Sequence, residues 1–322
     1  MPVVVVAVVV EDPPPVKLAI FARRRPQPEP QCDRFRSEAL QRGHEVRDAD
    51  VAAFVSGPIQ LDIDVDIGGP ILIGGVRVDD VDAVILGPLP GPAARTSPPG
   101  VMLSSSEHAA LTTRQYERHA LAWSIVTELE ARGVAVFSSP TRARPFDFKP
   151  AQLMALARAG LPVPPTRITD VDGPAGDDVD KPIAGGPVRS AGALVRGAPV
   201  IRQARLRGVD LRAVVVGDQV VALGRFPGDD DVIDLRERPA FADGSGRWEH
   251  DDDDVAASLA LRAARVCQCD FAAVDLKRSA RGLTILEVNR TPVVLDIEDD
   301  VGVPIAALFI DWVEASTRAR RR

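Results

Sequence analysis

Hydrophobic and polar positions follow two different periods along the 322-residue chain, and together they predict a mixed α/β fold. From Val16 onward, short apolar runs are typical of strands, and stretches with apolar positions three and four apart are typical of helices. In the first half the two kinds of element alternate, which indicates a mainly parallel sheet covered by helices. We expect strands at 17–21, 44–47, 81–86 and 134–137, and a β-excursion over 57–76. Helices are expected at 32–42, with Phe35, Ala39 and Leu40 on one face and an end at Gly43, and at 107–132, with an end at Gly133.

The second half of the chain predicts antiparallel pairing instead. A helix is expected at 149–159, ended by Gly160, and the prolines that follow it favour an extended entry into the next strand. Gly217-Asp218 lies between two apolar runs and is a hairpin signal. We expect strands at 166–169, 179–183, 199–203, 210–216, 219–225, 271–277 and 283–288, with further helices at 254–268 and 303–317. The four acidic residues at 251–254 are expected to cap the first of these helices.

Composition narrows the class of protein and its compartment. A chain with 45% hydrophobic and 26% charged residues is not disordered as a whole, and a net charge of −7 with 4% aromatic residues argues against nucleic-acid binding. No stretch approaches the roughly 20 apolar residues of a membrane helix. The valine-rich run 3–10 has no basic flank, so we expect a tail or an extra edge strand there. Three cysteines cannot form a disulfide framework, and they favour a cytoplasmic location.

Common catalytic motifs are missing from the sequence. It has no Gly-x-x-x-x-Gly-Lys-Ser/Thr loop and no Gly-x-Gly-x-x-Gly after the first strand, which mark P-loop and dinucleotide sites. It has no Gly-x-Ser-x-Gly elbow, and the four histidines lack ligand spacing. These classes of enzyme therefore have no support.

The most informative polar cluster is expected at the end of the last predicted hairpin. Glu287 and Asn289 alternate onto one face of their strand, and hairpin pairing can bring Asp275 beside them. Two carboxylates and an amide oxygen are hard ligands of the kind that Mg²⁺ prefers, and Mg²⁺ normally completes its octahedron with water and phosphate. The alternative is an ordinary polar strand end.

Two lysines suggest a phosphate site. Lys149 opens a helix, where the dipole disfavours a cation unless a phosphate neutralises it. Lys181 precedes the glycine-rich segment 184–186, whose amides can approach a phosphate. Two solvated lysines are the alternative interpretation.

Two arginines are candidates for binding phosphate or carboxylate groups, because the guanidinium makes bidentate hydrogen bonds to both. Arg212 and Arg225 belong to consecutive predicted strands, and we expect their side chains to share a face. A surface ladder of salt bridges would explain them equally well.

In this order along the chain, these residues resemble the ATP-grasp family of carboxylate–amine ligases over roughly 134–315. The resemblance rests on Lys149 with Gly160–Thr166, Lys181-Pro182, Gln203 before Asp210-Leu211-Arg212, Val215–Asp218, Ala273–Leu276 and Leu286–Asn289. Within the family, the chain is most similar to the ribosomal-protein glutamate ligases and to the graspetide (microviridin-type) macrocyclases. Ile233–Arg236 and Gly302–Ala306 favour the macrocyclases.

The resemblance implies an ATP-grasp fold that is α/β in the first half and α+β in the second. After the tail or extra strand at 1–15, it implies a pre-ATP-grasp domain at 16–144, a central subdomain at 145–205 and a C-terminal antiparallel-sheet subdomain with the metal site at 206–322. Arg202 follows Lys181 by only 21 positions, so the central subdomain is shortened and is expected to lack a helix. We expect this short, glycine-rich lid to be mobile without ligand and to need a substrate or a partner to close the site.

The resemblance also implies roles for individual residues. Lys149, Lys181 and Asp210 would bind ATP, with Gln203, Ala204, Arg205 and Leu206 as the hinge that contacts adenine. Asp275, Glu287 and Asn289 would hold Mg²⁺, while Arg212 and Arg225 would be catalytic, contacting the γ-phosphate and the acyl phosphate. The sequence departs from the family where the hinge lacks an acidic residue after Gln203, and where Arg290-Thr291-Pro292 replaces small residues.

The activity implied is an ATP- and Mg²⁺-dependent ligase that activates a peptide or amino-acid carboxylate as an acyl phosphate for attack by an amine or hydroxyl. The expected partner is a peptide or amino-acid substrate, with a precursor peptide carrying a leader as one candidate, and the expected assembly is a homo-oligomer, a dimer or tetramer. Two alternatives stay open: a degenerate module that binds nucleotide or peptide without turnover, and a free-standing amino-acid or dipeptide ligase. The substrate and the bond formed are not determined by the sequence.

Overall fold

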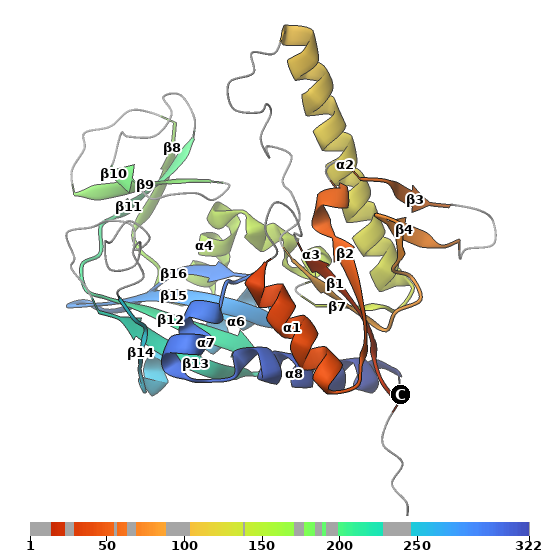
Figure 1. Cartoon of the computed structure of the whole chain (residues 1–322). Coiled ribbons are helices and arrows are strands. Elements are labelled where there is room, and N and C mark those ends of the chain that lie inside the picture. The colour runs from red at the N-terminus through yellow and green to blue at the C-terminus, as the bar shows by residue number, and fades with distance from the viewer. Residues whose placement is uncertain are drawn as a thin grey trace, which may run out of the picture.

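The computed structural model describes residues 14–22, 29–54, 57–62, 69–87, 104–137, 139–170, 177–183, 189–190, 199–227 and 246–321. Within these residues the chain forms an N-terminal parallel sheet, a central antiparallel sheet and a C-terminal antiparallel sheet, with a small three-stranded sheet beside the first (Figure 1). The valine-rich run 3–10, the glycine-rich segment 184–186, most of the predicted lid and residues 233–236 lie outside the described residues.

The N-terminal sheet has the parallel arrangement that the alternating pattern predicts. Its strands are ordered β2-β1-β6-β7, and each neighbouring pair is parallel. The strands are β1 (Lys17–Ala22), β2 (Glu45–Asp50), β6 (Ala83–Leu86) and β7 (Ala135–Phe137). Helix α1 (Pro30–Gln41) covers one face and helix α2 (Ser105–Ala131) covers the other, so β1, β6 and β7 are almost wholly buried.

The first helix follows its predicted apolar face with one correction. Phe35 and Ala39, four positions apart, are buried as predicted, whereas Leu40 is 45% exposed. Leu40 lies about 100° around the helix from Ala39, and this rotation takes it off the covered face. Gly43 follows the helix with φ +77°, a conformation that favours glycine.

The β-excursion predicted over 57–76 is confirmed as a small antiparallel sheet. It contains β3 (Ile59–Leu61), β4 (Ile71–Ile73) and β5 (Val76–Arg77). Gly74 and Gly75 connect the last two strands with φ values of +60° and +82°, as a tight hairpin turn requires. The N-terminal half of α2 is mostly exposed, and Figure 1 shows it extending beyond the sheet.

The central region begins with helix α3 (Pro140–Ala143), the 3₁₀ turn η2 (Arg144–Asp147) and helix α4 (Lys149–Arg158). Its sheet is antiparallel in the order β10-β9-β11-β8, with β8 (Thr166–Thr169), β9 (Asp178–Pro182), β10 (Arg189–Ser190) and β11 (Val200–Ala204). Asp180 and Arg202 face each other across the register and form a two-bond ion pair at 2.8 and 3.0 Å. The described part of 160–205 contains no helix, in keeping with the predicted shortening.

The C-terminal sheet is antiparallel and has the order β14-β13-β12-β15-β16. Its strands are β12 (Val209–Val216), β13 (Gln219–Phe226), β14 (Glu249–His250), β15 (Phe271–Ser279) and β16 (Gly282–Asn289). Helix α6 (Asp254–Val266) packs on one face, and α7 (Leu295–Val301) and α8 (Ile305–Arg321) lie against the other. The sequence pattern did not predict α7. Asp253 caps α6 by accepting from the amides of Val255 and Ala256, as expected for this acidic stretch.

One hydrophobic core joins the N-terminal and C-terminal sheets. Phe309 of α8 lies between Phe35 of α1 and Phe271 of β15, with ring centroids 5.0 and 4.2 Å away. Figure 1 shows α8 running along α1 and along the C-terminal sheet. This shared core places the start of α1 close to the chain segment that follows β16.

The three cysteines are buried free thiols. Burial raises the pKa of Cys32 and of Cys269 to about 12, so these thiols stay protonated. None of the helices described in the structure is long and apolar enough to cross a membrane.

Candidate active site

Three neighbouring strands place Arg212, Asp275 and Glu287 side by side. The register pairs Arg212 of β12 with Asp275 of β15, and Asp275 with Glu287 of β16. Asn289 is opposite Ala273, two positions further along the same face. The structure therefore brings together the three residues that the sequence suggested as metal ligands.

A β-bulge brings the Glu287 side chain onto the same face of the sheet as Asp275. The register of β15 and β16 shifts between Asp275 and Leu276, because Leu276 pairs with Ile285 while Asp275 pairs with Glu287. Leu286 is the additional residue. If the pairing of Leu276 with Ile285 continued without a bulge, Asp275 would lie opposite Leu286 and Glu287 would point to the other face of the sheet, since side chains alternate strictly.

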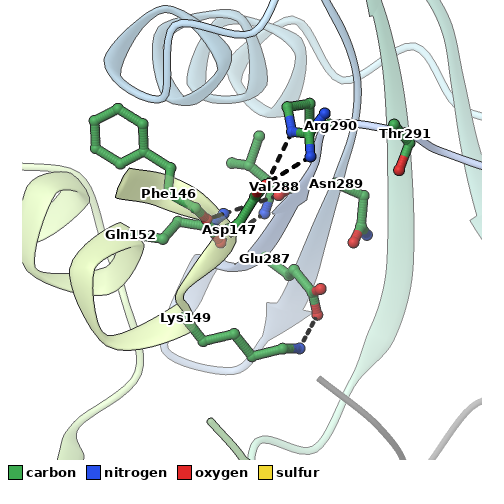
Figure 2. A pocket seen from close by; sticks show the side chains of 9 residues that line it. All are labelled: Phe146, Asp147, Lys149, Gln152, Glu287, Val288, Asn289, Arg290 and Thr291. Atoms are coloured by element: carbon green, nitrogen blue, oxygen red, sulfur yellow. Dashed lines mark hydrogen bonds and ion pairs between the residues drawn. The ribbon is translucent and has the colours of Figure 1, made fainter. Parts of the chain in front are cut away.

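Short hydrogen bonds hold the side chains of the row formed by Arg212, Asp275 and Glu287. Arg212 Nε donates to Asp275 Oδ1 at 2.8 Å and Nη2 donates to Oδ2 at 3.2 Å, while Asn289 Nδ2 donates to the same Oδ2 at 3.0 Å. Lys149 Nζ, at the start of α4, donates to Glu287 Oε2 at 2.5 Å (Figure 2). Burial alone would lower the pKa of Arg212, but the neighbouring charge and hydrogen bonds of Asp275 raise it above its ordinary value.

Trp248 supports the Arg212 side chain from the other side. The Arg212 Cζ atom lies 5.5 Å from the centroid of the Trp248 ring, within the range of a cation–π contact. The Trp248 indole N–H in turn donates to Asp296 Oδ2 at 3.1 Å. Arg212 is thus held by one carboxylate and one aromatic face, an arrangement that the sequence analysis did not predict.

The donor set fits a magnesium ion. Among the described residues no three of His, Cys, Asp and Glu gather into a cluster. The oxygen donors that could hold the ion are therefore the Asp275 and Glu287 carboxylates together with the Asn289 amide. These are hard oxygen donors, and Mg²⁺ usually takes only one or two carboxylates from a protein together with water and phosphate oxygens. Each carboxylate already carries one cationic partner, so the formal charges of the row balance.

A pocket of about 160 Å³ opens beside this row. Its lining comes from η2, α4 and the end of β16: Phe146, Asp147, Lys149, Gln152, Glu287, Val288, Asn289, Arg290 and Thr291 (Figure 2). Arg290 closes one side by donating to Asp147 through Nε at 2.9 Å and Nη2 at 3.0 Å. Arg290 stood out in the sequence only as a departure from the family pattern, and Asp147 did not stand out at all.

Gln152 is a site residue that the sequence analysis missed. It is 4% exposed, and its side-chain amide is hydrogen bonded to both backbone groups of Val288, at 2.8 and 2.9 Å. A signal existed, because Gln152 occupies a position on the apolar face of α4, four residues before the buried Leu156. A polar residue on such a face requires a buried partner.

The register corrects the expectation for Arg225. Arg225 is paired with Leu211, whereas Arg212 is paired with Gly224, so Arg212 and Arg225 point to opposite faces of the sheet. Arg225 instead forms an exposed ion pair with Glu249 at 2.8 Å. The predicted shared face of the two arginines is therefore wrong.

Asp210 lies on the same face as Arg212 but has its own partner. Both of its carboxylate oxygens accept from Lys277 Nζ at 3.1 Å, across the strand pairing of β12 and β15. The two side chains are only 15% and 8% exposed. The structure thus assigns Asp210 an ion pair within the sheet, two positions along the strand from Arg212.

The remaining predicted nucleotide residues lie in the central sheet. Lys181 is on β9, paired with Ile201. Gln203 is 2% exposed at the end of β11 and donates from Nε2 to Thr166 Oγ1 at 3.0 Å. Its side chain therefore fixes β11 to β8 rather than pointing outward.

The predicted hinge has two of its amides engaged inside the protein. The N–H of Ala204 donates to the Pro165 carbonyl at 3.3 Å, and the N–H of Arg205 donates to the Asp177 carbonyl at 3.2 Å. In the part of the chain that the structure describes, the N–H of Leu206 has no such partner. Leu206 is therefore the hinge amide available to an outside acceptor.

Part of the chain matches a known family model. Residues 201–313 match the model of the RimK-like ATP-grasp domain. The chain is 37% identical over 109 residues to a protein of Escherichia fergusonii named ribosomal protein bS6–L-glutamate ligase, a match that covers 34% of this chain and 35% of that protein. The match spans only about a third of the length of such curated relatives.

Two solved structures are similar over nearly the whole chain. The ATP-grasp ligase PsnB, complexed with a phosphomimetic variant of its minimal precursor, Mg and ADP, has a TM-score of 0.71 and 26% identity, with 94% of this chain and 98% of PsnB covered. The macrocyclase MdnB from Microcystis aeruginosa MRC has a TM-score of 0.68 at 16% identity, with 93% and 99% covered, which shows a common fold. The chain thus has the fold of the ATP-grasp ligases, and its residues 201–313 match the RimK-like ATP-grasp domain.

Proposed function

We propose that this chain is an ATP- and Mg²⁺-dependent ligase that activates a peptide carboxylate as an acyl phosphate for attack by an amine or a hydroxyl. The observation that carries the proposal is the row Arg212–Asp275–Glu287, with Lys149 on its far end, inside an ATP-grasp fold. It combines hard oxygen donors for a metal with two cations suited to phosphate, which is what phosphoryl transfer requires.

In this proposal Asp275, Glu287 and Asn289 hold the metal. Bound there, Mg²⁺ would neutralise charge that develops on the transferred phosphoryl group. With the carboxylates serving the metal, the N–H groups of Arg212 and Lys149 would be available to phosphate oxygens.

The nucleotide would lie between the central and C-terminal sheets. Lys149 and Lys181 contact its phosphates, and the Leu206 amide with the neighbouring hinge residues 203–205 contacts the adenine edge. Arg225 points to the face of the sheet opposite Arg212, and Asp210 is paired with Lys277 outside the proposed metal ligands, so neither is given the role that the family resemblance implied.

The reaction has two balanced steps. An oxygen of the substrate carboxylate attacks the γ-phosphorus, and the bond to ADP breaks, which gives an acyl phosphate and ADP. The amine or hydroxyl then attacks the acyl carbon, loses its proton, and expels phosphate. Arg212 stabilises the negative charge of the phosphoryl oxygens during both steps.

A peptide is the substrate class that the comparisons favour. PsnB, at 26% identity over almost the whole chain, is described in complex with its minimal precursor. We infer a precursor peptide with a leader as partner, a homo-oligomer as the assembly, a cytoplasmic location, and domain boundaries near residues 15, 144 and 205.

A degenerate module that binds nucleotide without turnover is the second candidate. It is favoured by the absence of any helix in the described part of 160–205, where a lid would lie. A small amino-acid or dipeptide ligase is the third.

The test measures ADP formation and product mass with MgATP, using short acidic peptides encoded next to the gene and, separately, free amino acids. We expect ADP release that depends on the peptide, with the loss of one water from the peptide for each bond formed within it. Nucleotide binding with no ADP release would favour the degenerate module. Turnover of free amino acids alone would favour the dipeptide ligase.

A further inference from the structure

We propose that Gln152 is a positioning residue that fixes the directions of Glu287 and Asn289 by pairing with the open edge of β16. The inference rests on the proposed function, because it concerns the residues that would hold Mg²⁺. β16 is the last strand in the order β14-β13-β12-β15-β16, so one of its edges has no strand partner among the described residues. Backbone groups on such an edge need another partner when they are buried.

The Gln152 side chain supplies this partner. Its Nε2 donates to the Val288 carbonyl at 2.8 Å, and its Oε1 accepts from the Val288 N–H at 2.9 Å. A primary amide carries the same donor and acceptor as a backbone peptide group, so it pairs with Val288 as a residue of a neighbouring strand would. Nε2 also donates to the Phe146 carbonyl at 3.1 Å, which fixes the orientation of the amide.

The position of this pairing matters for the site. Val288 lies between Glu287 and Asn289, so holding its peptide groups sets the directions in which both side chains leave the strand. The bulge at Leu286 comes directly before them and interrupts the regular ladder to β15. At this point the strand depends on its outer edge for a defined register.

Helix α4 carries two residues that hold the end of β16. Lys149 and Gln152 are three positions apart on it, and they contact Glu287 and Val288 respectively. Figure 2 shows both side chains pointing from α4 toward the end of β16. The helix that provides the cation for the Glu287 carboxylate thus also holds the backbone that carries this carboxylate.

A second glutamine makes the same pairing a few residues further on. Gln31, in α1, donates from Nε2 to the Pro292 carbonyl at 2.8 Å and accepts from the Val294 N–H at 2.7 Å. It holds the backbone beyond the ligands and does not touch a residue next to either carboxylate. Gln31 therefore gives a matched control with the same side chain and the same two kinds of hydrogen bond.

The experiment compares Gln152→Met with Gln31→Met in the full-length chain. Isothermal titration calorimetry with ADP at a series of Mg²⁺ concentrations gives the Mg²⁺ midpoint for nucleotide binding, and thermal unfolding without ligand gives the stability. We expect both variants to unfold at a lower temperature. Only Gln152→Met should raise the Mg²⁺ midpoint, by about tenfold, as loss of groups that orient metal ligands typically does.

A second variant keeps the test valid if Gln152→Met folds poorly. In Gln152→Asn the side chain keeps its amide but is one carbon shorter, so we expect it to retain part of the pairing with Val288 and to give a smaller rise of the Mg²⁺ midpoint. An unchanged midpoint in a folded Gln152 variant would overturn the proposal. Misfolding of both Gln152 variants beside a folded Gln31→Met would overturn it too, since the amide would then serve the fold as a whole. Absence of Mg²⁺-dependent ADP binding in the unaltered chain would instead contradict the proposed function, and the positioning role with it.

Discussion

The ammonium of Lys149 lies 2.5 Å from a carboxylate oxygen of Glu287, although 138 positions separate the two residues. Lys149 begins α4 and Glu287 is near the end of β16, so the contact joins the central region to the C-terminal sheet. The helix N-terminus disfavours a cation, and the carboxylate offsets this cost. In the proposed function, a bound metal and phosphate would replace this ion pair.

Replacing Lys149 by Met should weaken ATP binding because it removes the cation that turns to the phosphates. We expect the KM for ATP to rise by about tenfold or more, in line with about 1.5–3 kcal/mol for a hydrogen bond to a charged group. Steady-state kinetics at saturating Mg²⁺ measures the effect. An unchanged KM would show that Lys149 serves only as the partner of Glu287.

Replacing Glu287 by Ala should abolish ATP turnover and leave the fold intact. The carboxylate is a proposed metal ligand, and its hydrogen bond is to a side chain at the edge of the site rather than to the core. ADP production and circular dichroism measure the two properties. Glu249→Gln is the control, because Glu249 is a half-exposed carboxylate of the same domain that pairs with Arg225. Full turnover in Glu287→Ala would contradict the metal assignment.

Replacing Arg212 by Lys should reduce kcat by about 10²-fold, the scale seen when one group that stabilises transition-state charge is removed. Lysine keeps the charge but cannot make the two-bond contact that Arg212 makes with Asp275. Arg225→Ala should turn over ATP at the normal rate, since Arg225 points to the opposite face of the sheet. A large loss in Arg225→Ala would restore the catalytic role suggested by the family resemblance.

Asp251 should make stability depend on pH in the acid range. Hydrogen bonds from Arg278, at 2.9 and 3.0 Å, lower the pKa of Asp251 below its ordinary value of 3.8. A lowered pKa means that the carboxylate stabilises the fold above the ordinary value and that this contribution is lost as the pH falls through the lowered one.

The variant Asp251→Asn should therefore lose about 1–3 kcal/mol of unfolding free energy at neutral pH. The difference from the unaltered chain should shrink as the pH falls below about 3.8. Urea unfolding at several pH values measures it, with the exposed neighbour Asp252→Asn as control. Equal losses in the two variants at neutral pH would show that the contact with Arg278 contributes nothing.

Local sequence signals were sufficient for most elements of the fold. Apolar runs and helical periodicity predicted the four parallel strands and the helices around them, because the spacing of apolar residues reflects which face of an element is buried. Gly43, Gly133 and Gly160 ended three helices where predicted, each with positive φ. The ordered motifs from Lys149 to Asn289 pointed to the ATP-grasp fold.

Helix α7 and the exposed Leu40 were not predicted. Helix α7 (Leu295–Val301) is only seven residues long, too short to show a helical period in the sequence. Its position depends on contacts with the C-terminal sheet. Leu40 is apolar but faces away from the core, which no count of apolar positions reveals.

The sequence by itself determined which polar residues stand near strand ends, since alternation along one strand is a local property. Only the tertiary structure decided which of them meet. The bulge at Leu286 turns Glu287 toward Asp275, and the register of β13 turns Arg225 away from Arg212. Gln152 reaches Val288 because α4 packs against the edge of β16. Register and edge contacts join residues that are distant in the chain, and one shifted residue reverses a face, so their pairing depends on the whole fold.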